Sequence, residues 1–378
     1  MKFNWLFIFL VLSCSVSAQQ TDQEKQILKQ VAEEVEKMES GDLIVKNDSL
    51  YNYINSVELK IFGQEIVDKY KIKINIIRDP SFNAFAFPDG HIYIHSGLLC
   101  QMDNEAQLAT LIGHESIHVI NSHSFKEAKD ATSKANTFTV LNILTAGLAG
   151  GLIGLAGVLS ANLSIYGYSR ELETEADVMG LDYMIKADYD PHEANKLFQH
   201  LIDQVKANKI DEPYFYSTHP KLANRIEKID GLLKKKYSSV KGGNTFLEQF
   251  FGEIEWLIAM NAEMMISANQ PLFASKSIDR LLKADSLSGR NWYLKAEMQR
   301  KLSQKSESDS VIMFYEKSIQ ADSTFSPSYK RLGVICYKNK KYDRCILLLE
   351  KYLLANPDDK DKKFLQTYID KSKKELTL

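Results

Sequence analysis

Two histidines separated by three residues, His114 and His118, form the stretch of this sequence with the clearest chemical potential. A helix turns once in 3.6 residues, so both imidazoles would lie on one helix face, where neutral ring nitrogens suit Zn²⁺. Between them, Glu115 could take a proton from the water that attacks a peptide carbonyl. The pattern therefore predicts two metal ligands and a general base on one helix.

The residues around this motif predict the helix that it needs. Asp103 or Asn104 can cap a helix start, and Glu105 falls in the first turn. Apolar residues then recur at helical spacing, namely Leu108, Leu111, Ile112, Ile117, Val119 and Ile120. We therefore expect the motif to lie inside a buried amphipathic helix.

An acidic stretch further along could supply the third protein ligand that zinc hydrolases need besides one open position. If residues 169–180 are helical, Glu173 and Asp177 share a face one turn apart. Glu173 could then bind the metal while Asp177 holds a ligand histidine by its other nitrogen. Glu171 and Glu175 make the rival pair, and a solvated acidic helix face is the alternative without chemistry.

The order of these motifs resembles the HtpX, BepA and CAAX-prenyl-protease family of zinc peptidases, metallopeptidase family forty-eight. The likeness covers roughly residues 70 to 232. It rests on the histidine motif, on the ETEAD run followed by Gly180, and on Ser217-Thr218-His219-Pro220 ahead of Arg225-Ile226.

This resemblance implies a set of site residues. In the family's pattern the ligand glutamate lies four residues before the aspartate, which selects Glu173 over its two neighbours. The implied ligands of one Zn²⁺ per chain are His114, His118 and Glu173, with Glu115 as the base. His219 would donate to the oxyanion or occupy the open zinc position at rest, and Arg225 would orient it or the substrate. The alternative for His219 is a turn histidine before a proline, and His123 is expected to be only a polar helix-end residue.

Strand and hairpin patterns lie upstream of the histidines. Apolar residues alternate with polar ones over residues 71–77, and residues 83–87 join 91–94 across the turn sequence Pro88-Asp89-Gly90. In the family this hairpin resembles the edge strand along which an extended peptide lies. The implied substrate edge is Ala84, Phe85 and Ala86, and the alternative is an ordinary small sheet covering the helix.

The amino terminus has the pattern of an export signal. Lys2 precedes an apolar run, and small residues end at Ala18, so residues 1–18 are a predicted signal peptide. A lipoprotein attachment at Cys14 is the alternative. Export predicts a periplasmic or outer-membrane-associated location after cleavage.

Composition indicates a folded protein that does not bind nucleic acid. The 378 residues are 44% hydrophobic with a formal net charge of −2, so no strongly basic field exists to attract phosphates. Cys100, Cys336 and Cys345 remain after signal removal, and we expect buried thiols, although an oxidising compartment could join the last two.

Residues 137–168 are uncharged, rich in glycine and long enough to span a bilayer. A single crossing would put His118 and Glu173 on opposite sides of the membrane. Two ligands of one metal ion cannot be separated in this way. We therefore expect a buried or membrane-touching helical hairpin near the cleft, with peripheral membrane contact, rather than a re-entrant membrane segment.

The composition changes at residues 238–245, which predicts a flexible linker that few contacts cross. Beyond it, Asp322-Ser323 and Asn356-Pro357 lie 34 residues apart, the tetratricopeptide period. Positions resembling that repeat's signature are Ala274, Ile278 and Leu281 in a first unit and Tyr329, Leu332, Gly333, Cys345, Leu349 and Pro357 in the last. Extra residues near 303–308 predict a longer loop in the middle unit, and a generic helical bundle is the alternative.

Together these patterns predict an α+β, mainly helical chain. A zincin-like (gluzincin) peptidase domain would occupy residues 19–237, and an α-solenoid of tetratricopeptide-like repeats would occupy residues 246–378. The whole chain resembles BepA-type envelope peptidases. That resemblance implies a zinc-dependent endopeptidase that hydrolyses misfolded or stalled envelope proteins, with outer-membrane protein assembly machinery as a partner of the repeats. The alternative is a chaperone or assembly scaffold that binds clients through the repeats with a mostly closed zinc site, but a pure scaffold would not need Glu115.

Overall fold

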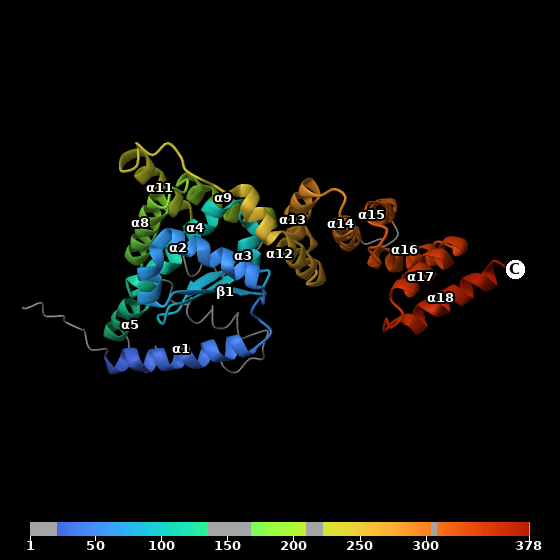
Figure 1. Cartoon of the computed structure of the whole chain (residues 1–378), viewed down its shortest axis with the longest axis horizontal. Coiled ribbons are helices and arrows are strands. Elements are labelled where there is room, and N and C mark those ends of the chain that lie inside the picture. Colours follow the sequence, from blue (N-terminus) through green and yellow to red (C-terminus); the bar gives the residue numbers. More distant parts are fainter. Residues whose placement is uncertain (1–20, 135–167, 209–221, 304–307, 378) are drawn as a thin grey trace, which may run out of the picture.

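The computed structural model of the chain describes residues 21–134, 168–208, 222–303 and 308–377. This part of the chain is mainly helical and contains one three-stranded sheet (Figure 1). Up to residue 134 the elements are α1 (Asp22–Ser40), α2 (Asp48–Tyr70), β1 (Lys73–Ile77), β2 (Ala84–Ala86), β3 (His91–His95), α3 (Ser96–Gln101), α4 (Glu105–Ile120) and α5 (His123–Lys134). From residue 168 on they are α8 (Arg170–Lys186), α9 (His192–Asn208), α11 (Leu222–Lys235), α12 (Leu247–Ser267), α13 (Pro271–Ala284), α14 (Gly289–Leu302), α15 (Asp309–Ala321), α16 (Pro327–Lys338), α17 (Tyr342–Ala355) and α18 (Lys362–Glu375).

The sheet has the order β1-β3-β2, with β3 parallel to β1 and antiparallel to β2. The strand predicted from alternating isoleucines and the predicted hairpin are thus both confirmed. Gly90 closes the hairpin with φ +106°, and a Cβ there would lie 2.4 Å from the carbonyl oxygen of Lys71. Only glycine fits this turn without strain.

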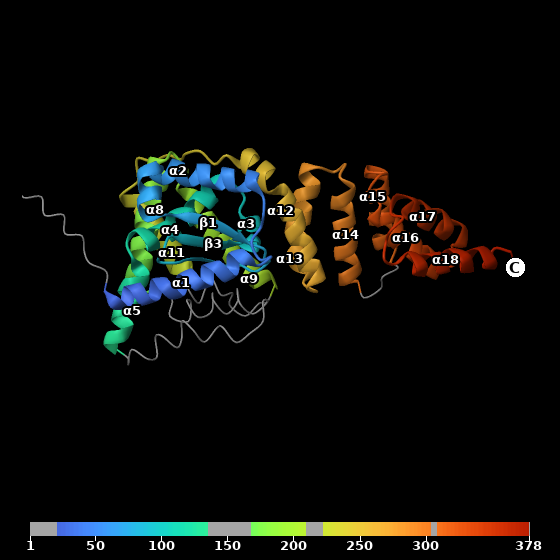
Figure 2. The same ribbon diagram turned by 60° about the horizontal axis from the view of Figure 1, so that its bottom comes forward.

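The two faces of the sheet pack against different partners. Alternation along a strand sends Ile92 and Ile94 into the main hydrophobic core, which also contains the apolar residues of α4. Phe85 and Tyr93 point to the other face, where they join Val31 and other apolar residues of α1. Helix α1 accordingly runs along the outside of the sheet (Figures 1 and 2).

Helix α4 carries the histidine motif and is buried along almost its whole length. Of the two predicted caps, Asn104 is the one used, because its side chain accepts a hydrogen bond from the Gln107 backbone at 3.1 Å. Helix α8 crosses α4 where Gly113 meets Gly180, and a Cβ on Gly180 would lie 3.0 Å from the carbonyl carbon of Gly113. The backbones of the two helices therefore touch without an intervening side chain.

The helices that follow residues 238–245 pack directly on the part of the chain before them. Phe250 and Leu257 of α12 belong to the same core as α2 and α4, and Arg280 of α13 donates to the Met102 carbonyl at 2.7 Å. The expectation that few contacts cross this linker is wrong, because α12 buries its apolar face against α2, α3 and α4. The division of the chain at residues 238–245 stays a prediction.

Helices α14 to α18 extend away from the sheet, each packing on the next along the chain (Figure 1). A second hydrophobic core lies among them. Most of the predicted signature positions are buried: Ala274, Ile278, Leu281, Tyr329, Leu332, Gly333, Cys345 and Leu349. Residues 304–307 of the predicted longer loop lie outside the described residues. Cys100, Cys336 and Cys345 are free and buried, as expected.

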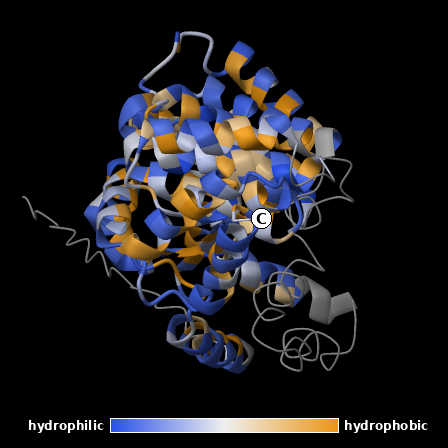
Figure 3. Cartoon of the chain, turned by 90° about the vertical axis from the view of Figure 1, so that its right-hand side faces the viewer, coloured by the Kyte–Doolittle hydropathy of each residue, from blue (hydrophilic) through white to orange (hydrophobic). Residues whose placement is uncertain are grey.

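The helices of the described segments carry both hydrophobic and hydrophilic residues (Figure 3). In the described part of the chain, no helix combines the length and apolar character that a membrane crossing needs. The predicted signal peptide, Cys14 and the glycine-rich segment apart from Tyr168 lie outside the described residues, so these predictions stay predictions.

Candidate metal centre

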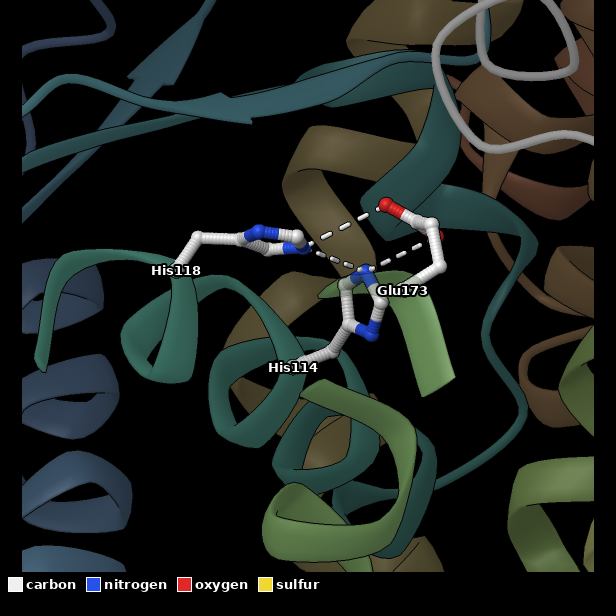
Figure 4. Close-up of side chains that lie close together, drawn as sticks. All are labelled: His114, His118 and Glu173. Carbon is white, nitrogen blue, oxygen red and sulfur yellow. Dashed lines mark hydrogen bonds and ion pairs between the residues drawn. The ribbon is translucent and has the colours of Figure 1, made fainter. Parts of the chain in front are cut away.

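Three buried side chains from two helices meet at one point (Figure 4). His114 and His118 come from α4 and Glu173 from α8, and one ligand atom of each lies within 4.8 Å of the others. The Nε2 atoms of the two histidines are 3.1 Å apart. Glu173 Oε2 lies 3.6 Å from His114 Nε2, and its Oε1 lies 3.4 Å from His118 Nε2.

This donor set fits a zinc ion. Ligand atoms at about 2.0–2.1 Å from a tetrahedral Zn²⁺ are about 3.3 Å apart, close to the 3.1 Å between the two imidazole nitrogens, and the carboxylate of Glu173 turns one oxygen toward each histidine. Two imidazoles and one carboxylate leave one of the four positions open, as in hydrolytic zinc sites. The rival glutamates do not join the cluster: Glu171 is exposed, and Glu175 contacts Asn121 at 2.8 Å instead.

Asp177 and Arg225 lie behind His114. Asp177 Oδ1 is 3.0 Å from His114 Nδ1, and it accepts a hydrogen bond from Arg225 Nη2 at 2.6 Å. Arg225 Nε also donates to Asp177 Oδ2 at 3.0 Å. When His114 donates its Nδ1 proton to Asp177, the lone pair is on Nε2, the ring nitrogen near Glu173. This is the tautomer that a metal ligand needs. Arg225 thus binds Asp177. The prediction that Arg225 orients His219 involves a residue outside the described part of the chain.

The electrostatic environment keeps the two histidines neutral. Burial lowers the pKa of His118 to about 4, and burial together with the charge of Arg225 lowers the pKa of His114. Burial acts to raise the pKa of Asp177, but Arg225 and His114 outweigh it and the pKa falls below its usual value. Neutral imidazoles beside an ionised aspartate are the protonation states that zinc binding requires.

Glu115 lies fully buried on α4 between the two histidines in sequence. Its charge acts on the pKa values of His118, Tyr168 and Arg225, so its carboxylate belongs to the same electrostatic neighbourhood as the cluster. A carboxylate held there is in the region where a general base would be needed.

The predicted substrate edge, Ala84 to Ala86, is strand β2 at one end of the sheet order. Within the described segments, β2 has a neighbouring strand on one side only, namely β3. It also contacts α4, which carries the histidines. Its side chains are buried, so an added peptide would pair with its backbone.

Sequence reasoning gave no site role to His123 or Tyr168, yet both contact His118. Nδ1 of His123 is 2.9 Å from Nδ1 of His118, and the ring of Tyr168 stacks on the His118 ring with centroids 3.8 Å apart. General chemistry could have suggested such a contact, since the second ring nitrogen of a metal-binding histidine usually has a hydrogen-bond partner. The turn between α4 and α5, where Ser122 has φ +53°, could not be predicted from the sequence.

Residues 53–233 match the model of a family described as Peptidase family M48. The chain is 31% identical over 213 residues to the mitochondrial metalloendopeptidase OMA1 of Schizosaccharomyces pombe, covering 54% of this chain and 60% of that protein. It is 27% identical over 207 residues to the beta-barrel assembly-enhancing protease of Escherichia coli, covering 50% of this chain and 42% of the relative. It is 30% identical over 196 residues to a putative beta-barrel assembly-enhancing protease of Vibrio cholerae, covering 48% and 39%. The chain therefore spans less than two thirds of each of these relatives.

Proposed function

Residues 53–233 of the chain form a peptidase domain of family M48, and from this premise we propose that the protein is a zinc-dependent endopeptidase. The observation that carries the proposal is the cluster of His114, His118 and Glu173, whose donor distances suit zinc. The cluster lies inside residues 53–233, the segment that matches the peptidase family, and this supports a role in peptide hydrolysis. The proposed reaction is hydrolysis of a peptide bond within a polypeptide.

We propose one role for each residue of the site. His114, His118 and Glu173 would hold one Zn²⁺, which when bound polarises the substrate carbonyl and lowers the pKa of water. Glu115 takes a proton from the attacking water and returns it to the leaving amine. Asp177, kept ionised by Arg225, fixes the tautomer and ring orientation of His114. His219 would reach the site to stabilise the oxyanion.

The sheet gives the proposed enzyme a way to bind substrate. An extended polypeptide would add to the open side of β2 through backbone hydrogen bonds, which depend little on side-chain identity. Such an edge strand next to the metal-binding helix is the arrangement of a zincin-like fold, which we propose for this domain. Broad selection of unfolded segments is the expected specificity.

We assign the biological role by extension. The name of the Escherichia coli relative refers to beta-barrel assembly. We propose that this protein acts on misfolded or stalled envelope proteins after export, in the periplasm or at the outer membrane. Residues 137–168 would touch the membrane there.

Helices α12 to α18 are proposed to form an α-solenoid of tetratricopeptide-like repeats that binds clients or assembly machinery. A cavity of about 290 Å³ among α14, α15, α16 and α18 supports a binding role for this region. Its lining combines cationic side chains with apolar ones, including Arg300, Arg331, Lys338, Val334 and Phe364. Phe364 is 57% exposed, which makes its ring accessible to a partner.

One observation favours the scaffold function as a second candidate. His114, Glu115, His118 and Glu173 are each at most 4% exposed, so these side chains are buried in this structure. A protein in this state could bind clients without cleaving them. Both functions could operate in one protein, with opening of the site deciding between them.

The proposed ligand set is tested by comparing two glutamates on α8. Glu173→Ala should lose most of the zinc measured by elemental analysis of the purified protein, because one of three protein ligands is gone. Glu171→Ala is the matched control, because Glu171 is exposed on the same helix, and it should keep its zinc. Equal zinc loss from the two variants would contradict the assignment, and a wild-type protein without zinc would contradict the proposed function.

A further inference from the structure

The second nitrogen of His118 has a specific partner that the proposed mechanism does not use. Nδ1 of His118 lies 2.9 Å from Nδ1 of His123, the first residue of α5, and both side chains are fully buried. Nε2 of His123 in turn lies 3.4 Å from Glu175 Oε2. Glu175 is held on its other oxygen by Asn121, whose amide donates at 2.8 Å. The four side chains form a continuous series from α4 to α8.

Zinc binding would allow only one arrangement of protons along this series. His118 needs its lone pair on Nε2, so in the neutral ring the proton sits on Nδ1 and is donated to His123 Nδ1. His123 must then accept on Nδ1 and carry its own proton on Nε2. That nitrogen lies 3.4 Å from a carboxylate oxygen of Glu175, which is ion-pair distance without hydrogen-bond geometry. The series therefore ends beside a carboxylate, whereas His114 contacts Asp177 directly at hydrogen-bond distance.

A second contact fixes the plane of the same ring. Tyr168 stacks on His118 with ring centroids 3.8 Å apart and planes inclined by 16°. The Tyr168 hydroxyl shares a hydrogen bond of 2.9 Å with Ser124, the residue after His123. Residues of α5 thus contact both Nδ1 of His118 and the tyrosine that stacks on its ring.

We propose that His123 is a positioning residue for the metal centre: it accepts from His118 Nδ1, while Glu175 orients His123. This inference rests on the proposed function, because it requires His118 to bind zinc through Nε2. Partners of this kind typically contribute 10–100-fold in metal affinity when tested by mutation. Glu175, which does not join the metal cluster, would instead act through His123 on His118.

Two substitutions at position 123 separate hydrogen bonding from packing. His123→Phe keeps a ring of similar size but has no acceptor for His118. His123→Asn places an amide oxygen near the position of Nδ1, so it can still accept. His192→Phe is the control, because His192 lies at the start of α9, has a side chain that is 47% exposed and contacts Asp190. Circular dichroism establishes that each full-length variant is folded.

The measurement is Zn²⁺ affinity by competition with a chromophoric chelator, together with the absorption spectrum of the Co²⁺-substituted protein. His123→Phe should bind zinc about 10–100-fold more weakly and shift the Co²⁺ spectrum, whereas His123→Asn and His192→Phe should stay within a few-fold of wild type. If His123→Phe does not fold, Glu175→Gln replaces it, with a smaller loss of affinity expected. Unchanged affinity in the folded variant overturns the positioning role. A wild-type protein that binds no zinc overturns the proposed function instead.

Discussion

Gly180 lies at the crossing of α4 and α8, and its replacement by alanine tests whether this close approach sets the geometry of the metal centre. A Cβ at this position would lie 3.0 Å from both the carbonyl carbon of Gly113 and the backbone nitrogen of His114. Ordinary van der Waals contact lies at 3.4–4 Å, so one backbone must move by a few tenths of an ångström. His114 lies on one helix and Glu173 on the other, so this movement would change the distance between the two ligands.

Two opposing energies decide the effect on stability. Alanine in a helix interior gains about 1 kcal/mol over glycine. Overpacking against backbone that cannot rotate away costs about 1–3 kcal/mol. We therefore expect Gly180→Ala to lower the free energy of unfolding by up to about 2 kcal/mol. Gly231→Ala is the control, because Gly231 lies inside α11 with nothing within 4 Å of an added Cβ, and it should stabilise the protein by about 0.5–1 kcal/mol.

Urea unfolding of the zinc-free proteins and chelator competition for Zn²⁺ measure the two consequences. Gly180→Ala should be less stable than wild type and should bind zinc more weakly, while Gly231→Ala should change only stability. If Gly180→Ala instead stabilises the protein as much as Gly231→Ala and keeps its zinc affinity, the backbone contact does not define the site.

Two further predictions concern the rest of the molecule. Truncation after Lys241 removes α12 and α13 from the shared core and should destabilise the remaining peptidase domain. Truncation after Ser303 keeps both helices and should leave the domain folded. Equal melting temperatures of the two truncated proteins would contradict the finding that α12 and α13 stabilise this domain. Burial raises the pKa of Glu58 from 4.5 to about 7, so the unfolded chain releases this proton first as the pH rises. The free energy of unfolding should fall by roughly 3 kcal/mol between pH 4.5 and 7 and then level off. Glu58→Gln should lack this slope in urea titrations, and an identical slope in both proteins would refute the burial argument.

The elements that local spacing specifies could be predicted from the sequence. His114 and His118 share a face because a helix turn is 3.6 residues, and the same periodicity places Glu173 beside Asp177. Gly90 follows from the chemistry of a turn that needs positive φ. The choice of Glu173 over Glu175 required the family resemblance, because both are compatible with one acidic helix.

The relations between distant elements could not be predicted in this way. An amphipathic helix such as α12 has the same pattern whether its apolar face packs on the next repeat or on α2 and α4. Likewise, His123 contacts His118 across the turn between α4 and α5, in which Ser122 adopts a left-handed conformation. Tertiary packing decides both cases, and the spacing of residues along the chain does not encode it.

Glu115→Gln is the most direct test of whether the protein is a zinc endopeptidase with Glu115 as its base. Glutamine keeps the size of the side chain but cannot accept a proton at neutral pH. The measurement is cleavage of an unfolded polypeptide by the purified full-length variant and by wild type, with zinc content determined on the same samples. We expect the variant to keep its zinc and to lose cleavage, whereas wild-type cleavage should depend on zinc. Cleavage at the wild-type rate by a zinc-loaded Glu115→Gln protein free of contaminating proteases would contradict it.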